Sequence, residues 1–352
     1  MSSWLNLKKF DGEITNRCNA ACVLCARTGI HNGVSDIIKS MGLRDVKVED
    51  YKEILTSKNG KNIVTINYCG NYGDPMMHPK AFEIFKQNHD LGVTKQRPDT
   101  NGGMRDKNWW SELGKIKSMR VQFAIDGLAD TNHIYRRNTD YEKIIENAKA
   151  YIDSGGAATW VMLVFEHNQH QVEDARELAK KMGFVDFAIK RTARGYNPDK
   201  PEHLEIQPYR KRNDQDIIKD KIKFTSIKKY QPDIMHKGRQ EYEVVPKCLS
   251  WKQMFITSDR LIIPCCHIQP GLFWHLGGKY AEKSRPFSLY LEENKIKYDL
   301  EKYAFDEIME SYEEFYPGFE KRWKEKSFPI CNKQCGSNFV NEVMMDNRDK
   351  YL

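Results

Sequence analysis

The sequence predicts an α/β fold, in which a parallel sheet built from six βα units is followed by a smaller cysteine-bearing region. Three observations support this prediction. Strand-like and helix-like segments alternate over residues 8–195, three cysteines cluster directly after the first strand-like segment, and five more lie in the last third of the chain. Alternating strands and helices are typical of parallel sheets whose functional residues lie at the carboxyl ends of the strands.

Six strand-like segments are expected to form the sheet, at residues 10–15, 62–69, 94–100, 119–125, 159–165 and 187–190. Helical patterns separate these segments at residues 48–56, 79–89, 108–116, 141–154 and 171–182. Strands that are joined through helices form right-handed βαβ units. Six such units are too few for a closed eight-stranded barrel, so an open arrangement is expected.

The chain is expected to divide into three segments. Residues 8–195 carry the alternating pattern, and residues 196–245 form a polar, proline-bearing stretch. Residues 246–340 carry the second set of cysteines. Polar stretches of this kind connect or interrupt folded units, so the middle segment is expected to be a connection or an insertion.

The composition indicates a soluble globular protein, with 40% apolar and 30% charged residues among 352. No apolar run approaches the roughly 18 residues that a membrane span needs. Residues 1–10 lack the apolar segment of a secretory signal, so a cytoplasmic location without membrane contact is expected. In that compartment, nine cysteines favour metal ligands over disulfides.

The net charge of +7 arises from 56 basic and 49 acidic residues. Lysine and arginine concentrate in residues 190–239, which is compatible with an anionic substrate or a nucleic acid. A solvated linker face is the favoured interpretation, because acidic residues are interleaved and no stacking aromatics are ordered along the segment. A nucleic-acid partner is therefore possible but not favoured.

Cys18, Cys22 and Cys25 form a C-x3-C-x2-C cluster directly after the first predicted strand. Three close thiolates can hold three corners of a cubane [4Fe–4S] cluster, because soft sulfur ligands suit iron–sulfur centres. A fourth cysteine is missing nearby, so one iron is left open to a ligand that is not protein. A zinc knuckle is the alternative, which the three-residue spacer and the missing fourth ligand disfavour.

This spacing resembles the signature of the radical S-adenosylmethionine (SAM) superfamily. The resemblance implies a partial (βα)6 barrel in which the open iron chelates the amino and carboxylate groups of SAM. It also implies that one electron from the cluster cleaves SAM to methionine and a 5′-deoxyadenosyl radical, which abstracts hydrogen from a substrate. The residue before the third cysteine, which is often aromatic and lies against the adenine in this family, is Leu24.

Residues 68–75 resemble the Gly-Gly-Glu-Pro loop of the same family, which follows the second strand and meets the SAM amino group. Glycine allows close backbone approach to a ligand, and proline stiffens the turn. The resemblance assigns cofactor contacts to Tyr72, Gly73, Asp74 and Pro75. Tyr72 stands where the family has glycine, and Asp74 stands where it has glutamate.

Three further elements resemble family motifs. Residues 100–103 are similar to a Thr-Asn-Gly element containing Asn101, and residues 124–127 are similar to a Ser-x-Asp-Gly element containing Asp126. A His-x2-Arg element ends in Arg136, whose planar guanidinium suits the SAM carboxylate. The alternative for this last element is a surface pair at the start of a helix.

The second set of cysteines is Cys248, Cys265, Cys266, Cys331 and Cys335. It resembles the auxiliary-cluster extension of radical SAM enzymes, which is called SPASM in its longer form and twitch in its shorter form. Five cysteines fit the shorter, single-cluster twitch form. The resemblance therefore implies a small C-terminal auxiliary-cluster domain. Residues 255–265 form an apolar run, a polar turn and a second apolar run before the thiol, which predicts a hairpin. The hairpin turns at Arg260, where the family usually has glycine.

Four of these cysteines are expected to ligate a second [4Fe–4S] cluster: Cys248, Cys265, Cys331 and Cys335. Cys266 is the spare thiol, although it can exchange roles with Cys265. A structural zinc ion in the same four-cysteine site is the alternative. Cys69 is expected to be a core thiol, and Cys69 and Cys266 are both hypothetical hydrogen-atom donors.

The resemblance implies a radical SAM enzyme, with an auxiliary cluster that transfers electrons. The expected reaction is oxidation, crosslinking or epimerisation of a peptide, a protein or a sugar-type molecule. Modification of a nucleotide or an RNA is the alternative. A non-catalytic iron–sulfur or zinc protein that binds nucleic acid is the rival from another class. A flavodoxin- or ferredoxin-type reductant is the expected electron donor.

Overall fold

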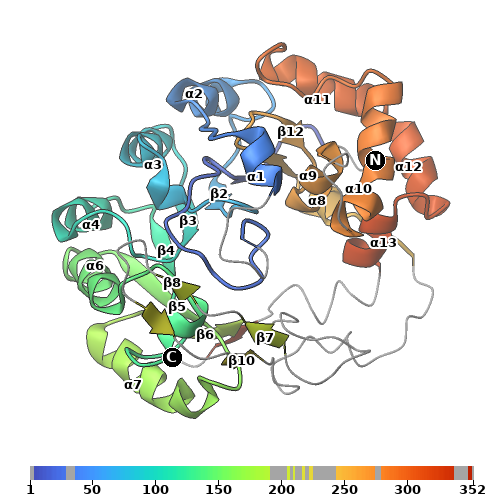
Figure 1. The fold of residues 1–352 in the computed structure, drawn as a ribbon. Helices are drawn as coiled ribbons and strands as arrows, with labels where there is room; N and C mark the ends of the chain where they lie inside the picture. Colours follow the sequence, from blue (N-terminus) through green and yellow to red (C-terminus); the bar gives the residue numbers. More distant parts are fainter. Residues whose placement is uncertain are drawn as a thin grey trace.

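The computed structural model is an α/β fold with a parallel sheet, as the sequence predicts (Figure 1). The structure describes residues 4–28, 36–190, 204–206, 209–210, 216–218, 222–224, 243–273, 279–336 and 348–350. Most of the expected connection, residues 196–245, lies outside the described residues.

Six parallel strands pair in the order of the sequence, which confirms the predicted strand pattern. The strands are β1 (Lys9–Gly12), β2 (Thr65–Tyr68), β3 (Lys95–Thr100), β4 (Arg120–Ala124), β5 (Ala157–Leu163) and β6 (Asp186–Lys190). Their carboxyl ends lie along one edge of the sheet, because all six run in the same direction.

Five longer helices connect these strands and follow one another along the outer side of the sheet (Figure 1). They are α2 (Val48–Thr56), α3 (Ala81–Asp90), α4 (Lys107–Gly114), α6 (Tyr141–Asp153) and α7 (Val172–Met182). Shorter elements are α1 (Asp36–Met41), η1 (Pro75–Met77), α5 (Asn132–Tyr135) and η2 (Gln169–Gln171). Asp106 and Asp140 cap α4 and α6 by accepting hydrogen bonds from backbone N–H groups of the first turn.

The two faces of the sheet differ in chemistry. Phe123 packs on Trp110 of α4 and Tyr151 of α6, with ring centroids 5.0 and 6.0 Å apart. Because side chains alternate along a strand, the neighbouring Gln122 points to the opposite face. The apolar core therefore lies between the sheet and its helices, and polar residues line the other face.

The C-terminal region extends the same sheet. Strand β11 (Gln253–Ile256) pairs in parallel with β1, and β12 (Ile262–Ile263) pairs antiparallel with β11, which confirms the predicted hairpin. At the other edge, β13 (Arg348–Lys350) pairs antiparallel with β6. The result is a nine-stranded sheet in which the hairpin lies beside the first strand of the chain.

Arg260 occupies the turn of this hairpin in a left-handed backbone conformation, with φ at 65°. Its guanidinium forms two 2.7 Å hydrogen bonds to the carboxylate of Asp50 on α2 and a third to Glu301. These bonds offset the cost of a conformation that usually favours glycine. The departure from the family's glycine therefore has a structural reason.

The helices of the C-terminal region lie around the start of the chain (Figure 1). Trp4 makes edge-on contacts with Tyr312, Phe319 and Trp323 at centroid distances of 5.1 to 5.8 Å. The helices are α8 (Lys247–Ser250), η5 (Cys266–Ile268), α9 (Gln269–Leu272), α10 (Lys279–Glu293), α11 (Phe305–Glu314), α12 (Tyr316–Lys324) and α13 (Pro329–Cys335).

Four short strands form two separate antiparallel ribbons, β7 with β10 and β8 with β9. They are β7 (Leu204–Ile206), β8 (Tyr209–Arg210), β9 (Asp216–Ile218) and β10 (Ile222–Phe224). Among the described residues, no helix has the length and apolar character to cross a membrane.

Candidate functional site

The first three cysteines lie in the loop that follows β1, at the carboxyl edge of the sheet. Their loop packs on an apolar cluster that includes Tyr135, Leu163 and Phe165. Burial raises the pKa of Cys18 and of Cys22, and the neighbouring thiols of the triad raise both pKa values further. The three thiols are therefore close together, and the surroundings of Cys18 and Cys22 disfavour free thiolates.

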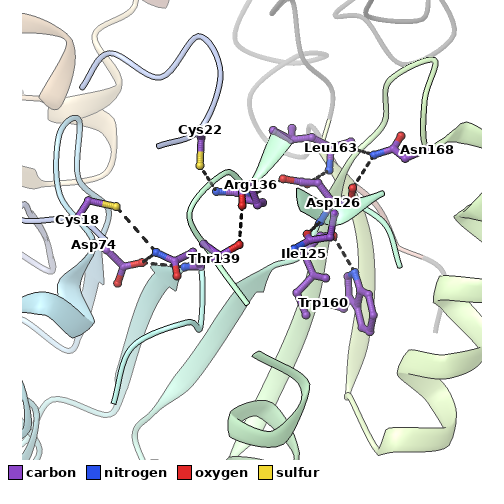
Figure 2. A network of polar contacts seen from close by, with 12 residues as sticks. Cys18, Cys22, Asp74, Ile125, Asp126, Arg136, Thr139, Trp160, Leu163 and Asn168 are labelled. Atoms are coloured by element: carbon purple, nitrogen blue, oxygen red, sulfur yellow. Dashed lines mark hydrogen bonds and ion pairs between the residues drawn. The ribbon is translucent and has the colours of Figure 1, made fainter. Parts of the chain in front are cut away.

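Nitrogen donors point at two of these sulfur atoms. Figure 2 shows Arg136 between Cys22 and Asp126, with its Nη1 3.6 Å from the Cys22 sulfur. The Asn101 side-chain nitrogen lies 3.9 Å from the Cys18 sulfur. Donors of this kind stabilise the negative charge of thiolates that ligate a metal cluster. The triad and its surroundings therefore fit a [4Fe–4S] cluster.

A buried ion pair holds Arg136 in this position. Its Nε donates to Asp126 Oδ2 at 2.6 Å, and the Asp126 side chain is fully buried. The other carboxylate oxygen of Asp126 accepts a hydrogen bond from the backbone N–H of Leu163 (Figure 2). The carbonyl of Asp126 accepts another from Asn168. Asp126 thus anchors the arginine to β5, and the structure brings these two predicted residues together beside Cys22.

Asn101 connects the cysteine loop with the loop after β2. Its side-chain nitrogen donates to Asn19 in the cysteine loop at 2.9 Å and to Asp74 at 2.7 Å. Its backbone N–H also donates to Asp74, at 2.8 Å. Thr100 and the backbone of Met76 donate to the same carboxylate. Asp74 thus fastens the loop after β2 to the end of β3 and starts η1 at Pro75.

Tyr72 and Leu24, two further predicted cofactor contacts, have different surroundings. Tyr72 is buried in an apolar cluster with Ile38, Met41 and Phe273, so its ring is occupied by protein. Leu24 adopts a left-handed backbone conformation, with φ at 58°, and packs beside the cysteine loop. The contacts of all these residues with a cofactor stay predictions.

Glycine is required at position 73 because the loop passes against the chain just before the cysteines. A Cβ atom there would lie 1.7 Å from the carbonyl oxygen of Thr15. This approach brings the backbone N–H groups of Tyr72 and Gly73 to the carboxylate of Glu13, which accepts both. The loop after β2 and the loop after β1 therefore form one unit.

Glu13 is a residue that sequence reasoning missed. It is 1% exposed, and its second carboxylate oxygen accepts a 2.8 Å hydrogen bond from Gln269 of α9. Burial raises the pKa of Glu13 to about 7, although these hydrogen bonds oppose the increase. The sequence does carry one signal for this role, an acidic residue at the end of the first predicted strand, five positions before Cys18.

The four cysteines expected to share a second cluster lie together. Cys248 is on α8, Cys265 precedes η5, and Cys331 and Cys335 lie one turn apart on α13. Burial raises the pKa of Cys265, and all three of the other thiols add to that increase. They line a cavity of about 130 Å³ together with side chains that include Trp251.

Backbone N–H groups face two of these sulfur atoms. The N–H of His267 donates towards Cys265, and the N–H of Lys247 donates towards Cys335, and each lowers the pKa of the thiol that burial has raised. Donors of this kind favour charged sulfur over neutral thiol. These two positions therefore suit thiolate ligands.

Indole N–H groups face the sulfur atoms of the other two cysteines, Cys248 and Cys331. Trp4 lies beside Cys248 and Trp323 beside Cys331, and each indole lowers the pKa of its neighbouring thiol. Both indole nitrogens are buried, and within the described chain neither finds an acceptor of full hydrogen-bond geometry. A negatively charged sulfur centre held at this position would supply the acceptor that these groups lack.

The described residues contain no group of three His, Cys, Asp or Glu side chains arranged to hold a single metal ion. A four-iron cluster distributes its thiolates over separate iron atoms, whereas one zinc ion needs four ligands at about 2.0–2.3 Å.

The two unassigned thiols lie near each other. Burial raises the pKa of Cys69, which follows β2, and Asp11 and then Cys266 increase it further. Burial also raises the pKa of Cys266, with Cys265 the next contribution. Burial thus favours the protonated form of both thiols. Their role as donors stays a prediction.

Comparison with known proteins gives one family and a small group of relatives. Residues 13–179 match the sequence profile of the Radical SAM superfamily. A probable GTP 3′,8-cyclase of Methanothermobacter thermautotrophicus is 22% identical over 275 residues, which cover 72% of this chain and 82% of the relative. A second probable GTP 3′,8-cyclase, from Methanothermobacter marburgensis, is 23% identical over 270 residues, with the same coverage.

Among solved structures, SuiB of Streptococcus suis bound to S-adenosylmethionine is similar in fold, with a TM-score of 0.50 and 12% identity. The similarity covers 75% of this chain and 61% of SuiB, so the chain spans about three fifths of the length of that protein. The match begins at Glu13 and includes the cysteine triad, Asp74, Asn101 and the Asp126–Arg136 pair. Residues 13–179 therefore form a radical SAM superfamily domain.

Proposed function

We propose that this protein is a radical SAM enzyme that holds one [4Fe–4S] cluster on Cys18, Cys22 and Cys25 and binds SAM beside it. The observation that carries the proposal is the position of the three thiols at the carboxyl edge of a parallel sheet, with Arg136 facing Cys22 and Asn101 facing Cys18. When bound, the cluster and SAM supply a 5′-deoxyadenosyl radical that removes hydrogen from a substrate.

The protein's own residues orient the cofactor in this proposal. Arg136 offers its guanidinium to the SAM carboxylate, because the Asp126 ion pair holds it beside Cys22. The loop after β2 offers backbone groups to the SAM amino group. Asp74 shapes that loop from within, since its carboxylate already accepts hydrogen bonds from Thr100, Asn101 and Met76.

We further propose that Cys248, Cys265, Cys331 and Cys335 ligate a second [4Fe–4S] cluster that serves electron transfer. Each of the four sulfur atoms has an N–H group facing it, from two indoles and two backbone amides. Full protein ligation leaves no iron for a substrate, so a redox role is the consistent one. A flavodoxin- or ferredoxin-type protein is the proposed reductant.

The proposed substrate is a peptide, a protein or a sugar-type molecule, which is oxidised, crosslinked or epimerised. A nucleotide is the second candidate, and the similarity to probable GTP 3′,8-cyclases supports it. An assay for conversion of GTP under reducing conditions distinguishes these two substrate candidates. Formation of a cyclised guanine nucleotide from GTP establishes the second candidate, and unchanged GTP in an assay that cleaves SAM rejects it.

Anaerobic reconstitution with iron and sulfide tests the proposal as a whole. We expect about eight irons per chain and formation of 5′-deoxyadenosine from SAM and dithionite. Cys22→Ala should abolish 5′-deoxyadenosine formation, and Cys331→Ala should halve the iron content while leaving the SAM-dependent cluster in place. Cys69→Ala is the matched control, with an unchanged iron content.

Zinc in place of iron, together with no cleavage of SAM, contradicts the proposal. That result favours the rival interpretation, a non-catalytic protein that binds nucleic acid. An iron content of about four per chain that Cys331→Ala leaves unchanged contradicts the second cluster alone.

A further inference from the structure

Two buried glutamines on adjacent strands have opposite surroundings. Gln96 of β3 is 0% exposed, and its side chain accepts from Tyr68 and donates to the Phe85 carbonyl at 2.7 Å and to Ser118 at 2.9 Å. Gln122 of β4 is 3% exposed, yet across the described chain neither its amide oxygen nor its amide nitrogen has a hydrogen-bond partner. Gln96 faces the helices, and Gln122 faces away from them.

Gln122 is one member of a row of polar residues on that opposite face. The register of the sheet pairs Asp99 of β3 with Gln122, Gln122 with Thr159 of β5, and Thr159 with Asp186 of β6. Paired residues of a parallel sheet point to the same face. The row crosses four neighbouring strands, two residues before β4 ends.

Other polar atoms of this face also lack partners. The Oδ1 atoms of Asp99 and Asp186 and the Nε atom of Arg97 are buried, and in the described part of the chain none has a hydrogen-bond partner. An unpaired buried polar group is costly, so natural proteins contain few of them. Several on one face, beside a candidate active site, indicate groups that a ligand satisfies.

The charge of the face restricts the ligand. On β1 to β6, three carboxylates that are not exposed share this face, those of Asp11, Asp99 and Asp186, against the cations Lys9 and Arg97. Asp11 is already hydrogen-bonded to Asn67 and Gln253, at 2.7 Å each. The carboxylate oxygens that remain unpaired therefore need N–H or O–H donors.

We propose that this face of β3 to β6 recognises the substrate, with Gln122 and Asp99 as specificity-determining residues for a neutral or cationic group rich in N–H or O–H donors. The Gln122 amide matches a donor–acceptor pair such as an amide or a hydroxyl, and the carboxylates match an ammonium group. A peptide lysine and an amino sugar share this chemistry. The inference rests on the proposed function, because it names the substrate class of the same site.

Thermal unfolding of two matched variants of the full-length protein tests whether the Gln122 amide is unpaired within the fold. Gln122→Met removes an unpaired amide, so the melting temperature should stay the same or rise by about 2–4 °C. Gln96→Met removes a fully paired amide from the neighbouring strand, and the melting temperature should fall by at least that amount. A fall for Gln122→Met as large as that for Gln96→Met overturns the inference, because it shows that Gln122 is paired within the fold.

Binding of defined probes tests the chemistry. Nα-acetyl-L-lysine amide, glucosamine and GTP are titrated into the reconstituted protein and followed by ligand-observed NMR. We expect at least one of the two amines to bind, and at least tenfold weaker binding to Asp99→Asn and Gln122→Met. Glu112→Gln, an exposed position on α4, is the control and should bind as the wild type does. Binding of Nα-acetyl-L-lysine amide indicates a peptide substrate, and binding of glucosamine indicates a sugar.

Failure to bind either amine overturns the assigned class, as does GTP binding that both variants weaken. Cleavage of SAM without substrate separates this inference from the proposed function. It should stay within about twofold of wild type in the control Glu112→Gln. A wild-type protein that binds an amine through these residues but never cleaves SAM contradicts only the proposed function.

Discussion

Asn71 donates a 2.9 Å hydrogen bond to the carbonyl oxygen of Cys266 and thereby joins two segments that are 195 residues apart. The same amide donates to Gln269 at 2.6 Å, and Gln269 donates to Glu13 at 2.8 Å. Glu13 accepts from the backbone of the loop after β2. A continuous set of hydrogen bonds thus connects the loop beside the cysteine triad with the residue next to Cys265.

The pH dependence of the free energy of unfolding should reveal the titration of Glu13. Burial raises its pKa from 4.5 to about 7, so the folded state binds a proton that the unfolded state releases between these values. The contribution of Glu13 to the free energy of unfolding is therefore fully present below pH 4.5. It is lost as the pH rises through 7, by about 3 kcal/mol in total. Urea unfolding of wild type and Glu13→Gln from pH 4 to pH 8 measures the difference.

Glu13→Gln should flatten this part of the profile, because the amide does not titrate. Asp259 also raises the pKa of Glu13, so Asp259→Asn should move the midpoint of the loss to a lower pH. Identical profiles for Glu13→Gln and wild type would show that Glu13 does not titrate in this range.

The Asp126–Arg136 pair should show strong coupling. Asp126→Asn leaves a buried guanidinium without its counter-charge, and we expect a loss of about 3–5 kcal/mol in the free energy of unfolding. Asp126→Asn with Arg136→Met should lose less than the sum of the two single changes, since no charge is left unpaired. Chemical denaturation of the four proteins completes the cycle.

The exposed Lys149–Asp153 pair on α6 is the control for that cycle, with an expected coupling of about 0–1 kcal/mol. Additive effects of the two changes at Asp126 and Arg136 would show that the pair does not act as a unit. Binding of SAM to Arg136→Met should also weaken under the proposed function.

Replacing Asp74 with the family's glutamate should destabilise the loop after β2. Asp74 is 5% exposed and accepts hydrogen bonds from three residues, so an added methylene displaces a carboxylate that has no room to move. We expect Asp74→Glu to cost about 1–3 kcal/mol. Asp90→Glu at an exposed position of α3 should change the free energy of unfolding by less than about 0.5 kcal/mol.

Denaturant unfolding measures both variants. Wild-type stability of Asp74→Glu would show that the loop accommodates the longer acid, and that its hydrogen bonds are less restrictive than the distances indicate.

The indole of Trp323 should influence the second cluster of the proposed function. Trp323→Phe removes an N–H group that faces Cys331, and a hydrogen bond to a ligating sulfur stabilises the reduced, more negative cluster. We therefore expect a more negative reduction potential, which a redox titration followed by electron paramagnetic resonance measures. Trp251→Phe changes another tryptophan that lines the cavity and should leave the potential unchanged. Equal potentials in all three proteins would exclude a contribution from the Trp323 indole.

Local patterns in the sequence were sufficient to predict the parallel strands and the cysteine loop. The strands have short apolar runs between amphipathic helices, and these patterns depend on neighbouring residues alone. The hairpin that turns at Arg260 was also predictable, because an apolar run, a polar turn and a second apolar run follow one another directly. The spacing of Cys18, Cys22 and Cys25 indicated the same chemistry as the match to a radical SAM superfamily domain.

Contacts between distant residues were not predictable in this way. Nothing in residues 253–256 indicates that β11 pairs with β1, because the partner of a strand depends on the whole fold. The hydrogen bond from Gln269 to Glu13 was not predictable for the same reason. Asp74 was expected to face the cofactor, but its hydrogen bonds to Thr100 and Asn101 depend on how two loops meet, which spacing does not encode.

The pairing of β1 with β11 has a consequence for how the protein is made. Lys9 and Gln253, which are partners in this pairing, are 244 residues apart, so β1 lacks one neighbour until that much more chain has been synthesised. At about 5–20 residues per second, the wait is roughly 10–50 s. An uncovered strand edge is prone to pair with other chains during that time. The sheet around β1, and with it the loop that carries the triad, is therefore expected to be complete only after β11 has been synthesised.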